Sequence, residues 1–387
     1  MAKDRRLYTL HLFFATYFVA TGMTAFVPKL YGEIGLSDGR IGLISAVTAT
    51  AGLFMQPVWG VLADRAKYKR TVVAVSLALA GCTCFLVLPA AGSFLPLLLV
   101  LTLYGILCLP AMPVGNAIAI EYTAQHGCAF GPVRMMGTVG YQAGILATGF
   151  ILAASLRPLY PAMGVMLLLA AGAALILPAV QGHQHRRERV SLSAFLQDRR
   201  LLLLMAVVFL GHIGHQFNLS FFSKHLGDLG ISNAVAGVIS TLSVALEIPF
   251  LLVGDRLMKR LSIWTWLTLG LVIGTIRFAL LSVLTAPWAI VLAQSLSIAH
   301  LACFEFFPMI YLGQAASPEL QASAQSVLQM ISFGVARIVG SLAGGLIADA
   351  MGIPAVYGIC GALMLVTALI FWEPMRRQRK TDGTAAH

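Results

Sequence analysis

The sequence predicts an all-α integral membrane protein with twelve spanning helices arranged as two six-helix halves. Of its 387 residues, 59% are hydrophobic and only 11% are charged, whereas a soluble protein carries roughly a quarter charged residues. A spanning helix needs about 20 apolar residues, and segments of that kind use nearly all of the chain. The basic residues fall in alternate connections between these segments. These observations leave no room for a separate soluble domain.

The expected spans follow one another closely, with one exception. They are residues 8–31, 41–63, 71–92, 95–120, 134–155, 158–180, 201–224, 232–254, 262–285, 288–312, 321–347 and 351–373. A polar stretch at residues 182–200 separates the sixth span from the seventh and is expected to be a cytoplasmic linker. It divides the chain into an N-terminal half, residues 1–181, and a C-terminal half, residues 201–387, which ends in a short cytoplasmic tail.

The net charge of +11 is explained by orientation in a membrane. Lys and Arg are enriched in the cytoplasmic connections of membrane proteins, and the alternate connections of this chain hold nearly all of them. The pattern predicts a multi-pass protein of the cell (inner) membrane with both termini in the cytoplasm. Its partners are then the lipid bilayer and a small solute, not nucleic acid, and a monomer is expected.

A charge cluster between the second and third expected spans is the most distinctive local feature. Its residues are Gly60, Leu62, Asp64, Arg65, Lys69 and Arg70. This pattern resembles the signature loop of the major facilitator superfamily, although Lys67 stands where the family usually has a second glycine. The simpler interpretation is an ordinary basic connection. The resemblance implies the major facilitator fold, alternating access, and a conformational latch at Asp64.

The two halves of the sequence echo each other. Asp255 and Arg256 follow the eighth expected span as Asp64 and Arg65 follow the second. Transporters of the superfamily are built from two such halves, and their substrate site lies between them near the midplane of the membrane. The repeat therefore supports the same family, and we expect Asp255 and Arg256 to share the conformational role.

Four ionisable residues interrupt the apolar spans of the C-terminal half. They are Glu247, Arg277, His300 and Glu305. Charge inside a membrane is costly, so each is a functional hypothesis, with a structural ion pair or a snorkelling side chain as the alternative. Burial favours the neutral form of a carboxylic acid, and a nearby cation favours the charged carboxylate. A conformational change that alters either condition can therefore switch the protonation of the side chain. We expect proton coupling here, with Glu305 before Glu247 as the carrier. His300 and Glu305 are five positions apart, so a shared α-helical face is not expected.

The start of the fifth expected span resembles one branch of the superfamily in particular. Residues 130–140 read Phe-Gly-x-x-Arg-Met-x-Gly-x-x-Gly, which resembles the lactose permease, phenylpropionate permease and nucleoside–proton symporter branch. The resemblance implies that Arg134, paired with a carboxylate such as Glu121, binds substrate. In the eleventh expected span, Arg337 stands where that branch usually has a small uncharged residue, and this departure suggests a different solute, such as an anion. The candidate substrate-binding residues are Arg134, Glu121, Asn116, Tyr17, Gln56 and Arg337.

No metal or cofactor site is predicted. The six cysteines have no metal-ligand spacing, and most of them lie inside apolar runs. His212 and His215 can share a helix face, but no third ligand is evident in the sequence.

Secondary transport is the function that these patterns favour. The sequence contains no Walker A motif, metalloprotease motif or nucleophile elbow, so an enzyme or an ATP-driven pump is not expected. The leading hypothesis is proton symport of a small organic solute, namely a sugar, a nucleoside or an aromatic acid. The alternatives are a proton-coupled drug or metabolite efflux antiporter and, from another class, a membrane sensor. The fifth span has several glycines but no proline within residues 134–155, which favours uptake over efflux.

Overall fold

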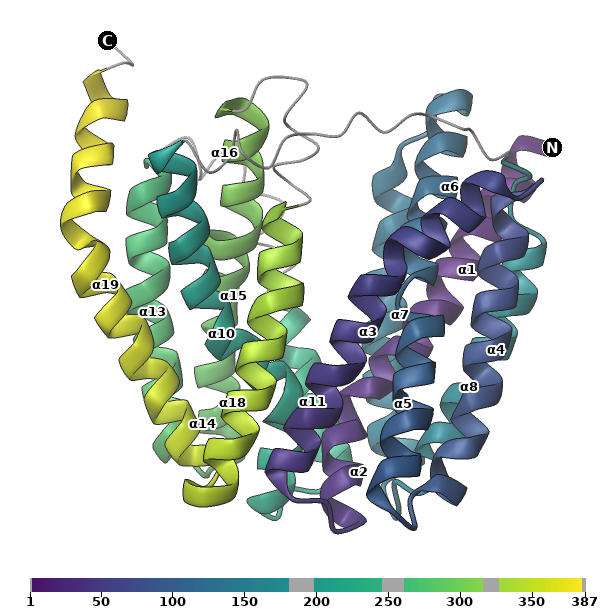
Figure 1. The fold of residues 1–387 in the computed structure, drawn as a ribbon, viewed down its shortest axis with the longest axis horizontal. Helices are drawn as coiled ribbons and strands as arrows, with labels where there is room; N and C mark the ends of the chain where they lie inside the picture. The colour runs from purple at the N-terminus through teal and green to yellow at the C-terminus, as the bar shows by residue number, and fades with distance from the viewer. Residues whose placement is uncertain (1, 181–197, 246–260, 316–326, 385–387) are drawn as a thin grey trace. The chain divides into compact units, whose positions relative to one another are not determined.

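The computed structural model describes residues 2–180, 198–245, 261–315 and 327–384. Within these ranges the chain forms helices and turns and no strands (Figure 1). Three residues expected to act in coupling or gating, Glu247, Asp255 and Arg256, lie outside the described residues.

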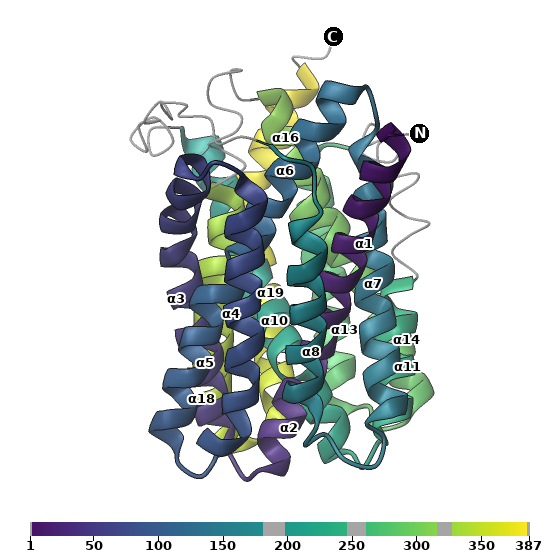
Figure 2. The same ribbon diagram turned by 90° about the vertical axis from the view of Figure 1, so that its right-hand side faces the viewer.

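The helices before the expected linker are long and closely spaced (Figure 2). They are α1 (Ala2–Met23), the 3-10 turn η1 (Thr24–Phe26), α2 (Val27–Glu33), α3 (Asp38–Arg65), α4 (Lys69–Ala90), α5 (Phe94–Cys108), α6 (Ala111–His126), α7 (Phe130–Ile151) and α8 (Leu159–Leu175). Glycine ends α6, because Gly127 has φ +63° and so adopts the left-handed conformation that favours this residue.

The helices after the expected linker include two short π-helical segments. The elements are α10 (Arg199–Asp228), α11 (Asn233–Ala245), α13 (Ile263–Val283), α14 (Pro287–Ser295), α15 (Ser297–His300), η2 (Leu301–Phe306), α16 (Phe307–Ala315), η3 (Met330–Val335), α18 (Ala336–Met351) and α19 (Ile353–Thr384). Both π-helical segments, η2 and η3, contact α10. Segments of this kind are rare and occur frequently at functional sites.

The chain groups into two compact units by its internal contacts. Unit 1 comprises Met1–Leu36, Ile44–Arg187 and Gly230–Val238, and unit 2 comprises Ser37–Leu43, Glu188–Leu229 and Ile239–His387. Compared with the expected halves, the first residues of α3 fall in unit 2 and the first residues of α11 in unit 1. In unit 2, Lys224 Nζ lies 3.0 Å from Asp38 Oδ1 and 2.9 Å from Asp228 Oδ2. The division into halves at residues 182–200 stays a prediction.

Nine helical stretches in the described part of the chain are long and apolar enough to cross a membrane. The fifth and sixth expected spans contain the helices α7 and α8, and the described part of the eighth forms α11. Of these, α8 and the apolar part of α11 are shorter than a spanning helix usually is. The all-helical membrane fold is therefore confirmed, and the count of twelve stays a prediction.

Large apolar side chains cover much of the outer surface. Phe54 is 74% exposed, Ile151 is 79% exposed and Val283 is 71% exposed. Exposed apolar surface on this scale marks an interaction with a membrane or a partner. Together with the length of the helices, it fits a surface that faces lipid.

Within unit 1, α1 packs along α7, and both views show the two helices side by side (Figures 1 and 2). Glycines of α7 make the close approach possible. A Cβ atom at Gly140 would lie 2.5 Å from the backbone oxygen of Ala15. Small residues at helix contacts are typical of membrane proteins, because association there depends on close packing.

Candidate functional site

In unit 2, helix α10 carries several of the residues that form a buried polar site. His212 lies in the middle of this helix and is completely buried. The preceding residue, Gly211, leaves room for the ring of Phe304, which a Cβ atom at that position would approach to 2.6 Å. Gln216, one turn further on, donates from Nε2 to the backbone oxygen of Ser332 in η3, at 2.9 Å. These contacts bring η2 and η3 against the same part of α10.

The π-helical segment η2 brings His300 and Glu305 together. In an α-helix, residues five apart point in directions roughly 140° apart, which is why a shared face was not expected. A π-helix bonds i to i+5, so residues five apart lie on successive turns of one face. His300 directly precedes η2 and Glu305 lies within it. The expectation from the five-residue spacing was therefore wrong, because the local helix is not an α-helix.

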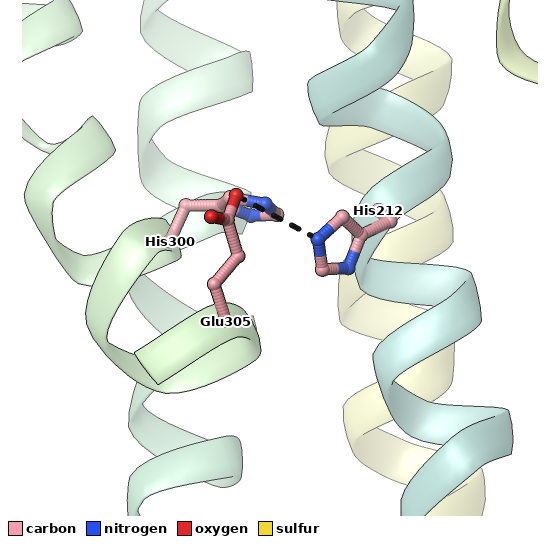
Figure 3. Close-up of side chains that lie close together, drawn as sticks. All are labelled: His212, His300 and Glu305. Atoms are coloured by element: carbon pink, nitrogen blue, oxygen red, sulfur yellow. Dashed lines mark ion pairs between the residues drawn. The ribbon is translucent and has the colours of Figure 1, made fainter. Parts of the chain in front are cut away.

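Figure 3 shows the resulting cluster of His212, His300 and Glu305. The side chains of His300 and Glu305 project from one helical segment, and that of His212 comes from the facing helix α10. His212 Nε2 lies 3.8 Å from Glu305 Oε1. The rings of His212 and His300 are 4.7 Å apart in a T-shaped arrangement. The Glu305 side chain is 23% exposed while that of His212 is 0% exposed, so the carboxylate is the accessible member.

A second imidazole pair and a buried arginine adjoin the cluster. His215 stacks on His300 with ring centroids 4.0 Å apart and planes only 9° from parallel. Arg277 of α13 is 2% exposed and donates from Nε to Oε1 of Gln294 at 3.1 Å. Its electrostatic interactions extend to both stacked imidazoles. Arg277 therefore adds positive charge beside His215 and His300.

A chain of neutral side chains supports Arg277. Gln294 Nε2 donates to Asn218 Oδ1 at 3.4 Å, and the hydroxyl of Tyr357 donates to the same oxygen at 3.1 Å. All four side chains are buried. Buried polar groups of this kind rigidify a core when they are bonded to one another. The network therefore fixes the position of the guanidinium relative to the imidazoles.

The cluster has the groups needed to exchange protons, because it holds one carboxylate and two imidazoles in a largely buried place, with the imidazole of His215 stacked on that of His300. The imidazole is the side chain whose ordinary protonation range includes physiological pH. The ligand atoms of His212, His300 and Glu305 also lie within 4.8 Å of one another. His215 is not part of this group, and the residues that join His212 in it, His300 and Glu305, come from a distant part of the chain.

In unit 1, Arg134 of α7 lies over an aromatic ring. Its guanidinium carbon is 4.6 Å from the ring centroid of Phe18 in α1, a cation–π contact. Gly137 makes room for both side chains, because a Cβ atom there would lie 2.7 Å from Phe18 and 2.9 Å from an Arg134 nitrogen. Tyr17, which is 4% exposed, packs edge-on against Phe18 at 5.4 Å. The aromatic contact orients the arginine, which is exposed as a residue.

The charged loop joins the ends of three helices of unit 1. Helix α3 ends at Arg65 and α4 begins at Lys69. Lys69 Nζ lies 3.2 Å from Glu121 Oε2 near the end of α6. Arg70 donates from Nη1 to the backbone oxygen of Leu177 at 2.8 Å. The motif thus contacts Glu121, a residue expected to bind substrate.

The remaining candidate residues differ in exposure. Asp64, Gln56 and Arg337 are exposed, and Asn116 is half-buried. The Oδ1 atom of Asn116 is buried without a hydrogen-bond partner among the described residues. On α7, the amide oxygen and the amide nitrogen of Gln142 are also buried without a hydrogen-bond partner among the described residues. Gln142 was not among the candidates, and the only signal for it was an amide inside an apolar span.

His212 is the main residue of the cluster that the sequence pattern did not assign to proton coupling. Its spacing to His215 indicated a shared helix face, but the sequence did not show that Glu305 would lie opposite it. Gln294 and Tyr357 were missed for the same reason, because each acts through a contact between distant helices.

Comparison with known proteins identifies the family. The model of the MFS_1-like family matches residues 7–359, which is most of the chain. The chain belongs to the MFS_1-like family. It is therefore a transporter of the major facilitator superfamily and not an enzyme.

Two relatives are similar to this chain along most of its length, and one solved structure shares its fold. The maltose permease of Geobacillus stearothermophilus is 24% identical over 373 residues, covering 95% of this chain and 94% of the relative. The xanthosine permease of Escherichia coli (strain K12) is 24% identical over 370 residues, covering 89% and 88%. The crystal structure of the nucleoside transporter NupG superposes with a TM-score of 0.84 at 18% identity, covering 95% of this chain and 98% of that one.

Proposed function

We propose that the protein is a proton-coupled symporter that carries a small organic solute, namely a sugar, a nucleoside or an aromatic acid, into the cell. The observation that supports this most is the partly buried carboxylate of Glu305, which lies 3.8 Å from His212. Coupling to Na⁺ would favour several oxygen ligands gathered in one place. The cluster of His212, His300 and Glu305 contains one carboxylate and two imidazoles instead, which suits protons better.

Roles for the other candidate residues follow from this proposal. Glu305 is the first choice of proton carrier and Glu247 the second, and Arg277 and His300 bias the carrier. Arg134 binds an oxygen-rich or anionic group of the solute, because its forked donors suit paired oxygens. The further solute-binding candidates are Tyr17, Asn116, Gln56, Glu121 and Arg337. Asp64 and the basic residues after it control the conformational change.

Relatives named for maltose and xanthosine support a polar solute. We further propose that the protein is a monomer in the cell membrane with both termini in the cytoplasm, since the basic connections alternate.

The test uses purified protein in proteoliposomes and four radiolabelled probes: uridine, xanthosine, maltose and 3-phenylpropionate. We expect one of them to accumulate when the interior is made alkaline relative to the outside, and to leak out when a protonophore is added. Accumulation only with the opposite pH gradient would favour the efflux antiporter. Accumulation that follows a Na⁺ gradient at constant pH would contradict proton coupling.

A further inference from the structure

We infer that His212 and Glu305 bind one exchangeable proton between them, which makes His212 a second member of the coupling pair. A role for this proton in transport rests on the proposed function, whereas the sharing of the proton is a property of the pair itself. The inference rests on the hydrogen bond that His212 makes within its own helix and on the direction in which its other nitrogen points.

The backbone fixes the tautomer of His212. Its Nδ1 lies 2.9 Å from the carbonyl oxygen of Val208. A carbonyl oxygen only accepts hydrogen bonds, so Nδ1 carries a hydrogen whatever the charge of the ring. A neutral His212 therefore presents a lone pair at Nε2, and this is the atom that faces Glu305 Oε1 at 3.8 Å.

The number of protons follows from the charges. With no proton on Nε2 or on Glu305, a lone pair faces a carboxylate and the two repel. With a proton on each, an imidazolium that is completely buried has no anion opposite it, which is costly. With one proton bound, the pair is an ion pair if the proton is on Nε2, and a neutral acid facing a neutral imidazole if it is on Glu305. This is the state of the pair with the least unbalanced charge.

The other ionisable groups around the pair direct the proton to it. His215 and His300 stack face to face at 4.0 Å, an arrangement in which two cations would repel each other. Arg277, which is buried on α13, interacts electrostatically with both rings and keeps a permanent positive charge near them. On the η3 side, the group that packs against His212 is the apolar ring of Phe333, at 5.8 Å. Glu305 is thus the anionic partner that the described residues offer to His212.

The geometry also gives the direction of exchange. Glu305 is the partly exposed member and His212 the enclosed one, so a proton from solvent binds the carboxylate first. Transfer then breaks the O–H bond at Oε1 and forms an N–H bond at Nε2, leaving a carboxylate and an imidazolium. A hydrogen bond spans 2.7–3.2 Å, so the side chains must approach by about 0.6 Å or more before the proton moves.

Infrared difference titration of the detergent-purified full chain tests the shared proton without a solute. The carboxylic-acid C=O band of Glu305 is identified by its absence in Glu305→Gln. In His212→Asn, the amide nitrogen can keep the bond to Val208 while the Nε2 position is lost. We expect the midpoint pH of the Glu305 band to move by about one unit or more, since sites that share a proton interact by that much. The second variant is His212→Gln, which puts an uncharged amide near the Nε2 position. It should move the midpoint pH of the Glu305 band in the same way.

The matched control is His225→Gln, another buried imidazole on α10 that packs on Tyr357 at 5.1 Å. It should leave the midpoint of the Glu305 band unchanged. Equal midpoints in the wild type and in both His212 variants would overturn the inference, as would a wild-type midpoint that moves when EDTA is added, because the carboxylate would then be competing for a metal ion. If the midpoint moves while Glu305→Gln still accumulates solute in a pH gradient, the shared proton stands and the proposed coupling fails.

Discussion

At the scale of single residues, charged side chains inside spans were visible in the sequence, and their partners were not. Arg277 is an example: its position inside a span was predicted, but its contact with Gln294, which joins α13 to α14, was not. Partners of this kind depend on how helices pack, and helix packing leaves little trace in one sequence. The same reason explains why His212 was recognised as one of a histidine pair and not as the partner of Glu305.

Replacing Arg134 by lysine tests its role in solute binding. Lysine keeps the charge but loses the planar fork and its stacking on Phe18. Hydrogen bonds to charged groups contribute about 1.5–3 kcal/mol, so Arg134→Lys should weaken solute binding at least about tenfold. Equilibrium binding of the probe that accumulates, measured in detergent, gives this affinity.

Arg157→Lys is the matched control for that measurement, because Arg157 is exposed in the connection between α7 and α8. It should bind the probe like the wild type. If Arg134→Lys folds and also binds like the wild type, the arginine has a structural role only.

At the scale of helices, the expected spans located the elements but not their local geometry. The tenth expected span, residues 288–312, corresponds to α14, α15, η2 and the first part of α16. Composition indicates an apolar helix there, but a π-helical segment has no period that a hydropathy pattern reveals. The site depends on this deviation, because η2 brings Glu305 and His300 to one face.

The contact between α1 and α7 gives a prediction at this scale. Gly140→Ala adds a Cβ atom 2.5 Å from the backbone oxygen of Ala15, so the helices must separate. Overpacking of a tight contact costs about 1–3 kcal/mol, and thermal unfolding in detergent should show a lower melting temperature.

Gly172→Ala in α8 is the control, since nothing lies within 4 Å of a Cβ atom at that position. This change should be neutral or stabilising by up to about 1 kcal/mol, because alanine favours a helix over glycine. Equal destabilisation by the two substitutions would show that the α1–α7 contact is not responsible.

At the scale of the whole molecule, composition and charge layout were enough for the class of protein. An apolar chain with few charges predicts a membrane protein, and the charged loop at Asp64 indicated the superfamily that the family match confirms. The grouping of the described helices was less predictable. Short segments at Ser37–Leu43 and Gly230–Val238 belong to units other than those the linker suggests, because they contact helices distant in sequence.

The most direct test of the central claim compares two transport modes in Glu305→Gln. Uphill uptake needs net proton release, whereas exchange of labelled for unlabelled solute does not. We therefore predict that Glu305→Gln loses accumulation driven by a pH gradient and keeps solute exchange. Glu33→Gln, which neutralises an exposed carboxylate at the end of α2, should keep both. If Glu305→Gln accumulates solute in a pH gradient as well as Glu33→Gln does, proton coupling through this carboxylate is contradicted.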